Sequence, residues 1–253
     1  MPSDWDPQVL PGWSWPAGPH LEISVYRPRL SDQESILESL HALLSLGAVL
    51  SGVGTTPAPG DDNVSPRNLN IHRSSELDAI VADPAQQIRE FYTDGYFESV
   101  SIVSLSPISD QASPTDRRLV DVDFEATDFE IGTDDDKARI GEQAYRLLLE
   151  LARSPEVAYG AIVGEGHWLS TPSVLADERS GAWFGSFLLT NWVDAVDREL
   201  VLDAFQAAYV EQLEFGTYVS TYEWLNPGRM RLLDGRQRDR SDLVRRVLAK
   251  NLA

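Results

Sequence analysis

The spacing of apolar residues alternates between the strand period and the helix period along the first half of the chain. Residues 21–26 have the alternating character of a strand, and residues 36–44 carry isoleucine and leucine at helical spacing. Ser31 and Glu34 have the spacing of a capping box, which begins such a helix, and Gly47 is placed to end it. This half also contains predicted strands at 48–53, 69–72 and 97–105 and a predicted helix at 85–92.

The second half shows the same order of elements with stronger signals. An alternating strand at 119–126 precedes a helix at 134–153, and a second helix is predicted at 194–213. Further strands are predicted at 157–163, 182–190 and 218–224. Each half therefore reads β-α-β-β-α-β. This pattern predicts an α+β fold of two tandem ferredoxin-like (βαββαβ) units, each an antiparallel sheet with helices packed on one face, followed by a C-terminal helix.

Proline content and charge divide the chain further. Five prolines exclude a helix from residues 1–19, which we interpret as a Pro/Trp-rich arm docked by its tryptophans. A polar, proline-containing connection ends the first α+β unit, residues 20–106, and leads into the second, residues 118–225. Residues 229–253 form a basic amphipathic C-terminal segment.

The chain has a formal net charge of −19, with 40 Asp and Glu residues against 21 Lys and Arg residues, and only Lys137 and Lys250 are lysines. An acidic, lysine-poor composition resembles that of proteins from salt-accumulating archaea, in which salt screens the repulsion between like charges. A GC-rich genome, which favours Arg over Lys, is the alternative explanation. We expect an acidic, halophilic, cytoplasmic protein that does not bind nucleic acid, because its charge repels phosphate backbones.

The sequence lacks the residues and motifs of several protein classes. The absence of cysteine excludes a disulfide scaffold, a zinc ribbon and a thiol enzyme. The apolar stretches are too short to cross a bilayer and no charged-then-apolar leader opens the chain, so no membrane association is expected. The patterns of a nucleophile elbow, a zinc-protease helix and a phosphate loop are also missing, and no cofactor is predicted.

The C-terminal segment differs in charge from the rest of the chain. Residues 229–253 contain eight bases and three acids, on an otherwise strongly acidic protein. An apolar stripe and two arginines make this segment a candidate partner-binding helix: Leu243, Val244, Val247, Leu248, Arg245 and Arg246. It could fold back onto the acidic body, pair with a second copy in a homo-oligomer, or hold another protein partner.

The strand at 119–126 contains the most specific polar pattern in the chain. Asp121, Asp123 and Glu125 alternate with apolar residues, so all three carboxylates line one face of the strand. Hard divalent cations prefer oxygen ligands of this kind. The layout is similar to the palm layer of nucleotide cyclases and polymerases, in which paired aspartates hold two metal ions. The alternative is a solvated, salt-adapted acidic face without a metal.

These observations support two functions and leave open whether the protein is an enzyme. The first is a non-enzymatic interaction or ligand-binding protein, because catalytic motifs are missing and the C-terminal segment suits a partner. The second is a divalent-metal-dependent enzyme of phosphoryl transfer or nucleotide processing, which would use Asp121, Asp123 and Glu125.

Overall fold

The computed structural model describes the chain in separate stretches. These are residues 20–57, 67–71, 74–83, 85–105, 118–126, 132–164, 171–176, 186–205, 209–220 and 237–252. The predicted arm at 1–19, the predicted connection at 106–117 and the start of the basic segment at 229–236 lie outside the described residues.

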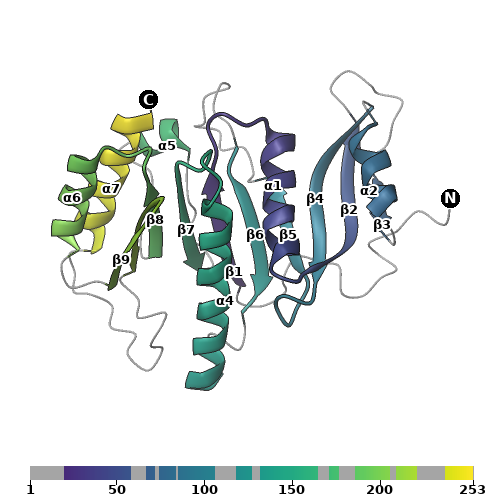
Figure 1. The fold of residues 1–253 in the computed structure, drawn as a ribbon, viewed down its shortest axis with the longest axis horizontal. Coiled ribbons are helices and arrows are strands. Elements are labelled where there is room, and N and C mark those ends of the chain that lie inside the picture. Colours follow the sequence, from purple (N-terminus) through teal and green to yellow (C-terminus); the bar gives the residue numbers. More distant parts are fainter. Residues whose placement is uncertain are drawn as a thin grey trace.

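The described strands form one antiparallel sheet in the order β3-β2-β4-β5-β6-β1-β7-β8-β10-β9 (Figure 1). The strands are β1 (His20–Tyr26), β2 (Val49–Pro57), β3 (Arg67–Asn70), β4 (Gln86–Asp94), β5 (Ser101–Leu105), β6 (Val120–Glu125), β7 (Tyr159–Gly164), β8 (Ser186–Thr190), β9 (Tyr209–Leu213) and β10 (Gly216–Ser220). The helices are α1 (Asp32–Ser45), α2 (Ser74–Val81), α4 (Asp134–Ala152), α5 (Pro172–Ala176), α6 (Ala195–Ala204) and α7 (Gln237–Leu252). The prediction of an α+β fold with antiparallel strands is confirmed.

Strand β1 lies in the middle of the sheet, between two strands from the second half of the chain. It pairs antiparallel with β6 on one side and with β7 on the other. Strands β6 and β7 are therefore parallel to each other, and α4 connects them as in a split βαβ unit. The pairing joins the two predicted units in one continuous sheet, so their separation into two ferredoxin-like sheets is not confirmed.

A glycine allows α4 to lie close to the centre of the sheet. A Cβ atom added to Gly160 of β7 would lie 2.9 Å from the Leu148 side chain of α4 and 3.0 Å from the Ser24 carbonyl oxygen of β1. The second of these contacts is with backbone, which cannot move aside easily. The sequence at Gly160 thus fits the close packing of α4 over β1 and β7.

One face of the sheet is covered by α1, α2 and α4, and Figure 1 shows α1 and α4 side by side on it. Alternation along β1 and β6 directs their apolar side chains to this face, where they form a common core with the buried residues of both helices. The residues of this core that are fully excluded from solvent include Ile23, Val25, Val122, Phe124, Ile36, Leu40, Leu147 and Leu148.

Helices α5, α6 and α7 lie on the opposite face, over β7, β8 and β10. Phe187 of β8 and Val219 of β10 belong to a second core on this face, and Phe187 meets Phe205 edge-on at a centroid distance of 5.3 Å. The prediction that helices pack on one face is therefore wrong. The sheet has apolar positions on both faces of its β7–β10 portion, and each face needs its own cover.

The boundaries predicted for the helices α1 and α4 are confirmed. The Ser31 hydroxyl accepts a hydrogen bond from the Glu34 backbone, and the Glu34 carboxylate accepts one from the Ser31 backbone, as a capping box requires. Gly47, just beyond the C-terminal end of α1, has a φ of +98°, a conformation that favours glycine. Thr133 and Asp136 form the equivalent capping box of α4.

The predicted helix at 85–92 is wrong, because these residues belong to strand β4. Strand β2 pairs Gly54 with Glu90 and Thr55 with Ile88, so Arg89 is an extra, bulged residue. The bulge brings Ile88 and Phe91 into the same core, although they are three residues apart. An interrupted strand thereby reproduces the i, i+3 spacing of a helix.

The predicted helix at 194–213 is also only partly right. Helix α6 ends at Ala204, and strand β9 follows at the edge of the sheet. Helix α2 lies where no element was predicted. No helix in the described stretches combines the length and apolar character needed to cross a membrane.

Helix α7 is part of the folded body. Val244, Val247 and Leu248 of the predicted partner-binding stripe are buried in the second core, and Arg245 is buried as well. The Arg245 guanidinium donates to the Leu175 carbonyl oxygen of α5 at 3.0 Å. These four residues therefore contact the chain itself and are not available to a partner; Leu243 is half-buried and Arg246 is exposed.

The C-terminal end of α7 is fastened to α6 by polar contacts. The Lys250 ammonium group donates to both carboxylate oxygens of Asp197, at 2.8 and 3.0 Å, and the Asn251 amide donates to the same carboxylate at 2.8 Å. In the described part of the basic segment, α7 therefore packs on its own chain, and pairing with a second copy or another partner stays a prediction.

Replacing Leu248 by Ala should lower the free energy of unfolding by about 2–5 kcal/mol, because a fully buried side chain is removed from the second core. Leu200→Ala on α6 is the matched control: Leu200 is 51% exposed, and its replacement should change stability by less than about 0.5 kcal/mol. Urea denaturation of both variants measures the difference. Equal small effects would show that α7 does not pack as described.

Candidate functional site

Strands β1, β6 and β4 carry polar side chains on the sheet face opposite to α1 and α4. Glu22 and Ser24 of β1 stand directly across from Asp123 and Asp121 of β6. Glu90 of β4 lies on the same face, and all five residues are buried. We refer to the four carboxyl groups, Glu22, Glu90, Asp121 and Asp123, as the acidic sheet face.

The contacts of Ser24 require a proton on one of its two acidic neighbours. The Ser24 hydroxyl oxygen lies 2.5 Å from a carboxyl oxygen of Glu22 and 2.7 Å from a carboxyl oxygen of Asp121. A hydroxyl has one proton and can donate in only one of these contacts. The other contact is favourable only if the carboxyl group donates to the serine oxygen. At least one of the two carboxyl groups is therefore protonated.

Burial raises the pKa values of Glu22 and Asp123. Removal from water is the largest cause for both groups, and the negative charge of Asp121 adds to it. The pKa of Glu22 rises to about 9 and that of Asp123 to about 8. Both groups are consequently neutral at pH 7, which avoids the cost of burying adjacent like charges.

Glu90 has partners of a different kind. The guanidinium of the bulged residue Arg89 contacts its carboxylate, and the Tyr92 hydroxyl donates to the same oxygen at 2.7 Å. Glu90 thus has a basic partner and a hydroxyl donor, whereas Glu22 and Asp121 share the single hydroxyl of Ser24.

The predicted metal ligands are not equivalent in the structure. Asp121 and Asp123 are buried, at 3% and 2% exposure, whereas Glu125 is exposed. In the part of the chain that the structure describes, no three His, Asp or Glu residues are grouped to hold a metal ion. The alternative of a solvated acidic surface is wrong for the two aspartates. Metal binding stays a prediction, and it requires deprotonation of carboxyl groups that burial keeps neutral.

The free energy of unfolding should fall as pH rises toward 9. In the folded protein Asp123 keeps its proton up to about pH 8, whereas the ordinary pKa of an aspartic acid side chain is 3.8. Between these two pH values the folded state therefore binds one more proton than the unfolded state. One such group costs about 1.4 kcal/mol of stability per pH unit. Glu22 acts in the same direction up to about pH 9.

Asp123→Asn should reduce this slope and make the variant more stable than wild type at pH 9, because an amide does not titrate. Glu125→Gln, an exposed position on the same strand, is the control and should leave the slope unchanged. Chemical denaturation between pH 5 and about 9 measures both. The same slope in wild type and Asp123→Asn would contradict the protonated state of Asp123.

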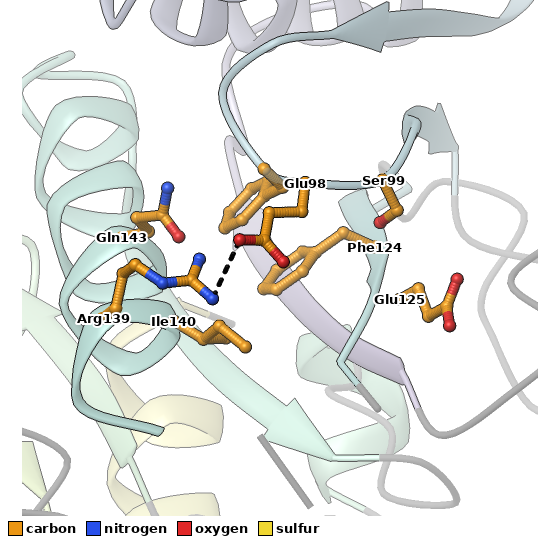
Figure 2. Close-up of a pocket in the computed structure, with 8 residues that line it drawn as sticks. Glu98, Ser99, Phe124, Glu125, Arg139, Ile140 and Gln143 are labelled. Carbon is orange, nitrogen blue, oxygen red and sulfur yellow. Dashed lines mark ion pairs between the residues drawn. The ribbon is translucent and has the colours of Figure 1, made fainter. Parts of the chain in front are cut away.

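A cavity lies on the other face of the sheet, between α4, the end of β6 and the loop that joins β4 to β5. It has a volume of about 250 Å³ and is lined by Phe97, Glu98, Ser99, Phe124, Glu125, Arg139, Ile140 and Gln143 (Figure 2). We refer to it as the α4 cavity. Figure 2 shows residues of α4 on one side and Glu125 at the end farthest from the helix.

Aromatic packing and two hydrogen bonds hold the cavity wall in place. The rings of Phe97 and Phe124 stack with centroids 3.6 Å apart and planes 7° from parallel. The Tyr96 hydroxyl donates to the Gln143 carbonyl oxygen at 2.9 Å, and the Gln143 side-chain amide donates to the Tyr96 carbonyl oxygen at 2.7 Å. These reciprocal bonds fix the β4–β5 loop to α4.

Two of the residues that line the α4 cavity each have one buried polar atom without a hydrogen-bond partner. These atoms are the Ser99 hydroxyl oxygen and Oε1 of Gln143. The bond from Nε2 of Gln143 to Tyr96 sets the orientation of the amide, which leaves Oε1 as the acceptor without a donor. An unsatisfied buried polar atom costs about 1–3 kcal/mol.

Charged groups also line the α4 cavity. The Arg139 guanidinium lies 3.1 Å from the Glu98 carboxylate, across the cavity, and 3.6 Å from Asp136 on its own helix (Figure 2). Glu125 adds another carboxyl group to the lining. Among the described residues, the lining therefore contains the carboxyl groups of Glu98 and Glu125 and the guanidinium of Arg139, which is paired with Glu98 and Asp136.

Comparisons with known proteins provide little further information. No protein-family model matches the chain, and no curated protein matches it. Among solved structures, the Pseudomonas aeruginosa T6SS protein PA0821 is similar, with a TM-score of 0.45 and 12% sequence identity over 92% of this chain and 73% of that chain. A likeness this distant carries no argument about function.

Sequence analysis found part of these two sites. The alternation of Asp121 and Asp123 was recognised, but Glu22 and Ser24 show the same alternation in β1 and could have been noticed. Their meeting depends on the pairing of β1 with β6, which no local pattern contains. The sequence analysis did not predict the α4 cavity. It is lined by a loop and by a helix about 45 residues further along the chain, which only the fold brings together. The missing hydrogen-bond partners of Ser99 Oγ and Gln143 Oε1 are likewise visible only in the structure.

Proposed function

We propose that this chain is a non-enzymatic ligand-binding protein and that the α4 cavity is its binding site. The observation that carries the proposal is a cavity of about 250 Å³ with an apolar wall, formed by Phe97, Phe124 and Ile140, and with polar residues in the rest of its lining. Binding sites commonly combine an apolar wall with a few placed polar groups, as this cavity does.

The walls of the cavity are held in place by the fold, so a ligand could bind without a large rearrangement of the chain. Its walls come from α4, from β6 and from a loop that is bonded to α4 at both Tyr96 and Gln143. Phe97, Phe124 and Ile140 belong to the main core as well as to the cavity lining. A site supported in this way loses little conformational freedom when it binds a ligand.

This proposal keeps the binding role predicted from the sequence and changes its location. The C-terminal segment was the expected binding element, but four of its six named residues are buried within the chain. The acidic sheet face is a less suitable binding site, because three of its four carboxyl groups, those of Glu22, Asp121 and Glu90, already have partners in Ser24, Arg89 and Tyr92.

A fragment screen that includes neutral, anionic and cationic compounds tests the proposal. Ligand-bound protein should show changes in the amide resonances of residues 97–99, 124–125 and 139–143, observed by NMR on the full chain. Ser99→Leu, which fills the cavity from the loop side, should abolish these changes. Ser45→Leu adds the same side chain at an exposed position of α1 and should leave them intact.

The proposal would be contradicted if no fragment of any charge class shifted these resonances. It would also be contradicted if fragments bound Ser99→Leu as well as wild type. The spectrum of each variant without ligand shows whether it is folded, so a lost response can be assigned to the cavity.

A further inference from the structure

We infer that strand β9 binds an extended segment of another protein, which has a basic residue between two apolar residues and adds to the sheet as one more antiparallel strand. The inference goes beyond the proposed function and does not depend on the α4 cavity. It follows from the position of β9 at the end of the strand order, from the direction of its backbone groups and from the charge and exposure of its side chains.

Strand β9 is an edge strand without the usual protection against pairing. It is the last strand in the sheet order and pairs with β10; on its other side, no strand lies within the described stretches (Figure 1). Edge strands are commonly protected by lysine, proline or a bulge. The sequence of β9, Tyr-Val-Glu-Gln-Leu, has neither lysine nor proline, and its register with β10 is unbroken. The strand at the other edge, β3, is shorter and begins with Arg67.

The hairpin of β9 and β10 shows which backbone groups point outward. Leu213 and Gly216 flank a two-residue loop, so their backbone groups bond to each other. Successive residues of a strand direct their N–H and C=O groups to opposite sides, so Glu211 points toward β10 like Leu213. The N–H and C=O groups of Val210 and Gln212 therefore point away from β10, toward the free edge of the sheet.

The side chains of β9 favour a partner with apolar and basic residues. Tyr209 is 40% exposed and Val210 is 38% exposed. Glu211, between the two outward-pointing residues, accepts hydrogen bonds at Oε2 from the hydroxyl groups of Tyr145 and Tyr209, and no base of the described residues pairs with it. Residues 199–228 contain five acids and no lysine or arginine. A basic side chain opposite Glu211 therefore supplies a counter-charge that this part of the chain lacks.

A second copy of this chain is a poorer partner for the same edge. Antiparallel self-pairing through both outward-pointing residues sets Val210 opposite Gln212 of the second copy, and it therefore sets the two Glu211 side chains opposite each other. Like charges in directly opposed positions are destabilising, and each chain has a net charge of −19. A strand with a base opposite Glu211 replaces this repulsion by attraction, and apolar β-forming residues on either side of the base favour the extended conformation.

The test is an NMR titration of the full chain with the capped peptide acetyl-Thr-Val-Lys-Val-Thr-amide and with its counterpart that has glutamate in place of lysine. The lysine peptide should shift the amide resonances of Val210 and Gln212 more than that of Glu211, whose N–H already donates to β10. It should also slow amide hydrogen exchange at Val210 and Gln212. The lysine peptide should bind at least about twofold more tightly than the glutamate peptide.

Methylated peptides separate strand pairing from attraction between side chains. In the antiparallel arrangement the N–H groups of both peptide valines point to β9, whereas the N–H group of the lysine points away. N-methylation of either valine should weaken binding by about tenfold or more, because a hydrogen bond is lost and the methyl group lies between the strands. N-methylation of the lysine should leave binding unchanged.

Substitutions in β9 test the same contacts from the side of the protein. Val210→Pro removes an outward-pointing N–H and keeps the bonds to β10, so it should weaken binding of the lysine peptide by about tenfold or more. Val210→Thr keeps the N–H and a β-branched side chain and is the matched control. Glu211→Gln should reduce the preference for the lysine peptide over the glutamate peptide. The spectrum of each variant without peptide shows whether it is folded.

The inference would be overturned if neither peptide shifted the resonances of Val210 and Gln212, or if the lysine and glutamate peptides bound equally. Unchanged binding after methylation of the valines would also overturn it, since the backbone would then not pair. Shifts at these two residues that grow with protein concentration, without peptide, would show that a second copy occupies the edge. The fragment screen observes other residues, so failure of either proposal can be recognised separately.

Discussion

The position of β1 between β6 and β7 determines the rest of this structure. Because β6 and β7 are both antiparallel to β1, the chain between them must cross over the sheet, and α4 makes this connection. Gly160 lets the helix pack closely against the middle of the sheet. The same crossing brings Arg139 and Gln143 to the β4–β5 loop, where they form the α4 cavity.

The pairing of β1 with β6 also brings acidic side chains together on the face of the sheet opposite to α1 and α4. It places Glu22 beside Asp121 and Asp123, in positions where water cannot stabilise three charges. The sheet accommodates them because burial raises the pKa values of Glu22 and Asp123, and because Ser24 bridges two of the carboxyl groups. The protonated form of these groups is therefore a condition for the central strand pair, and alkaline pH acts against it.

The sequence predicts elements that depend on neighbours along the chain. Ser31, Glu34 and Gly47 define the ends of α1 correctly, and the alternation of β6 shows which residues share a face. The prediction was wrong at residues 85–92, where pairing with the distant strand β2 produces a bulge at Arg89 and gives β4 a helical spacing. The packing of α7 against α5 and α6 likewise depends on distant parts of the chain. The sequence shows the apolar stripe of α7, but only the fold shows which parts of the chain pack against it.

The central claim is that the α4 cavity binds a small ligand, and the most direct measurement is a set of crystal structures of the full chain soaked with neutral, anionic and cationic fragments. The account predicts a fragment bound in the cavity, with its apolar part against Phe97 or Phe124. Crystals in which fragments of every charge class leave the cavity empty would contradict it.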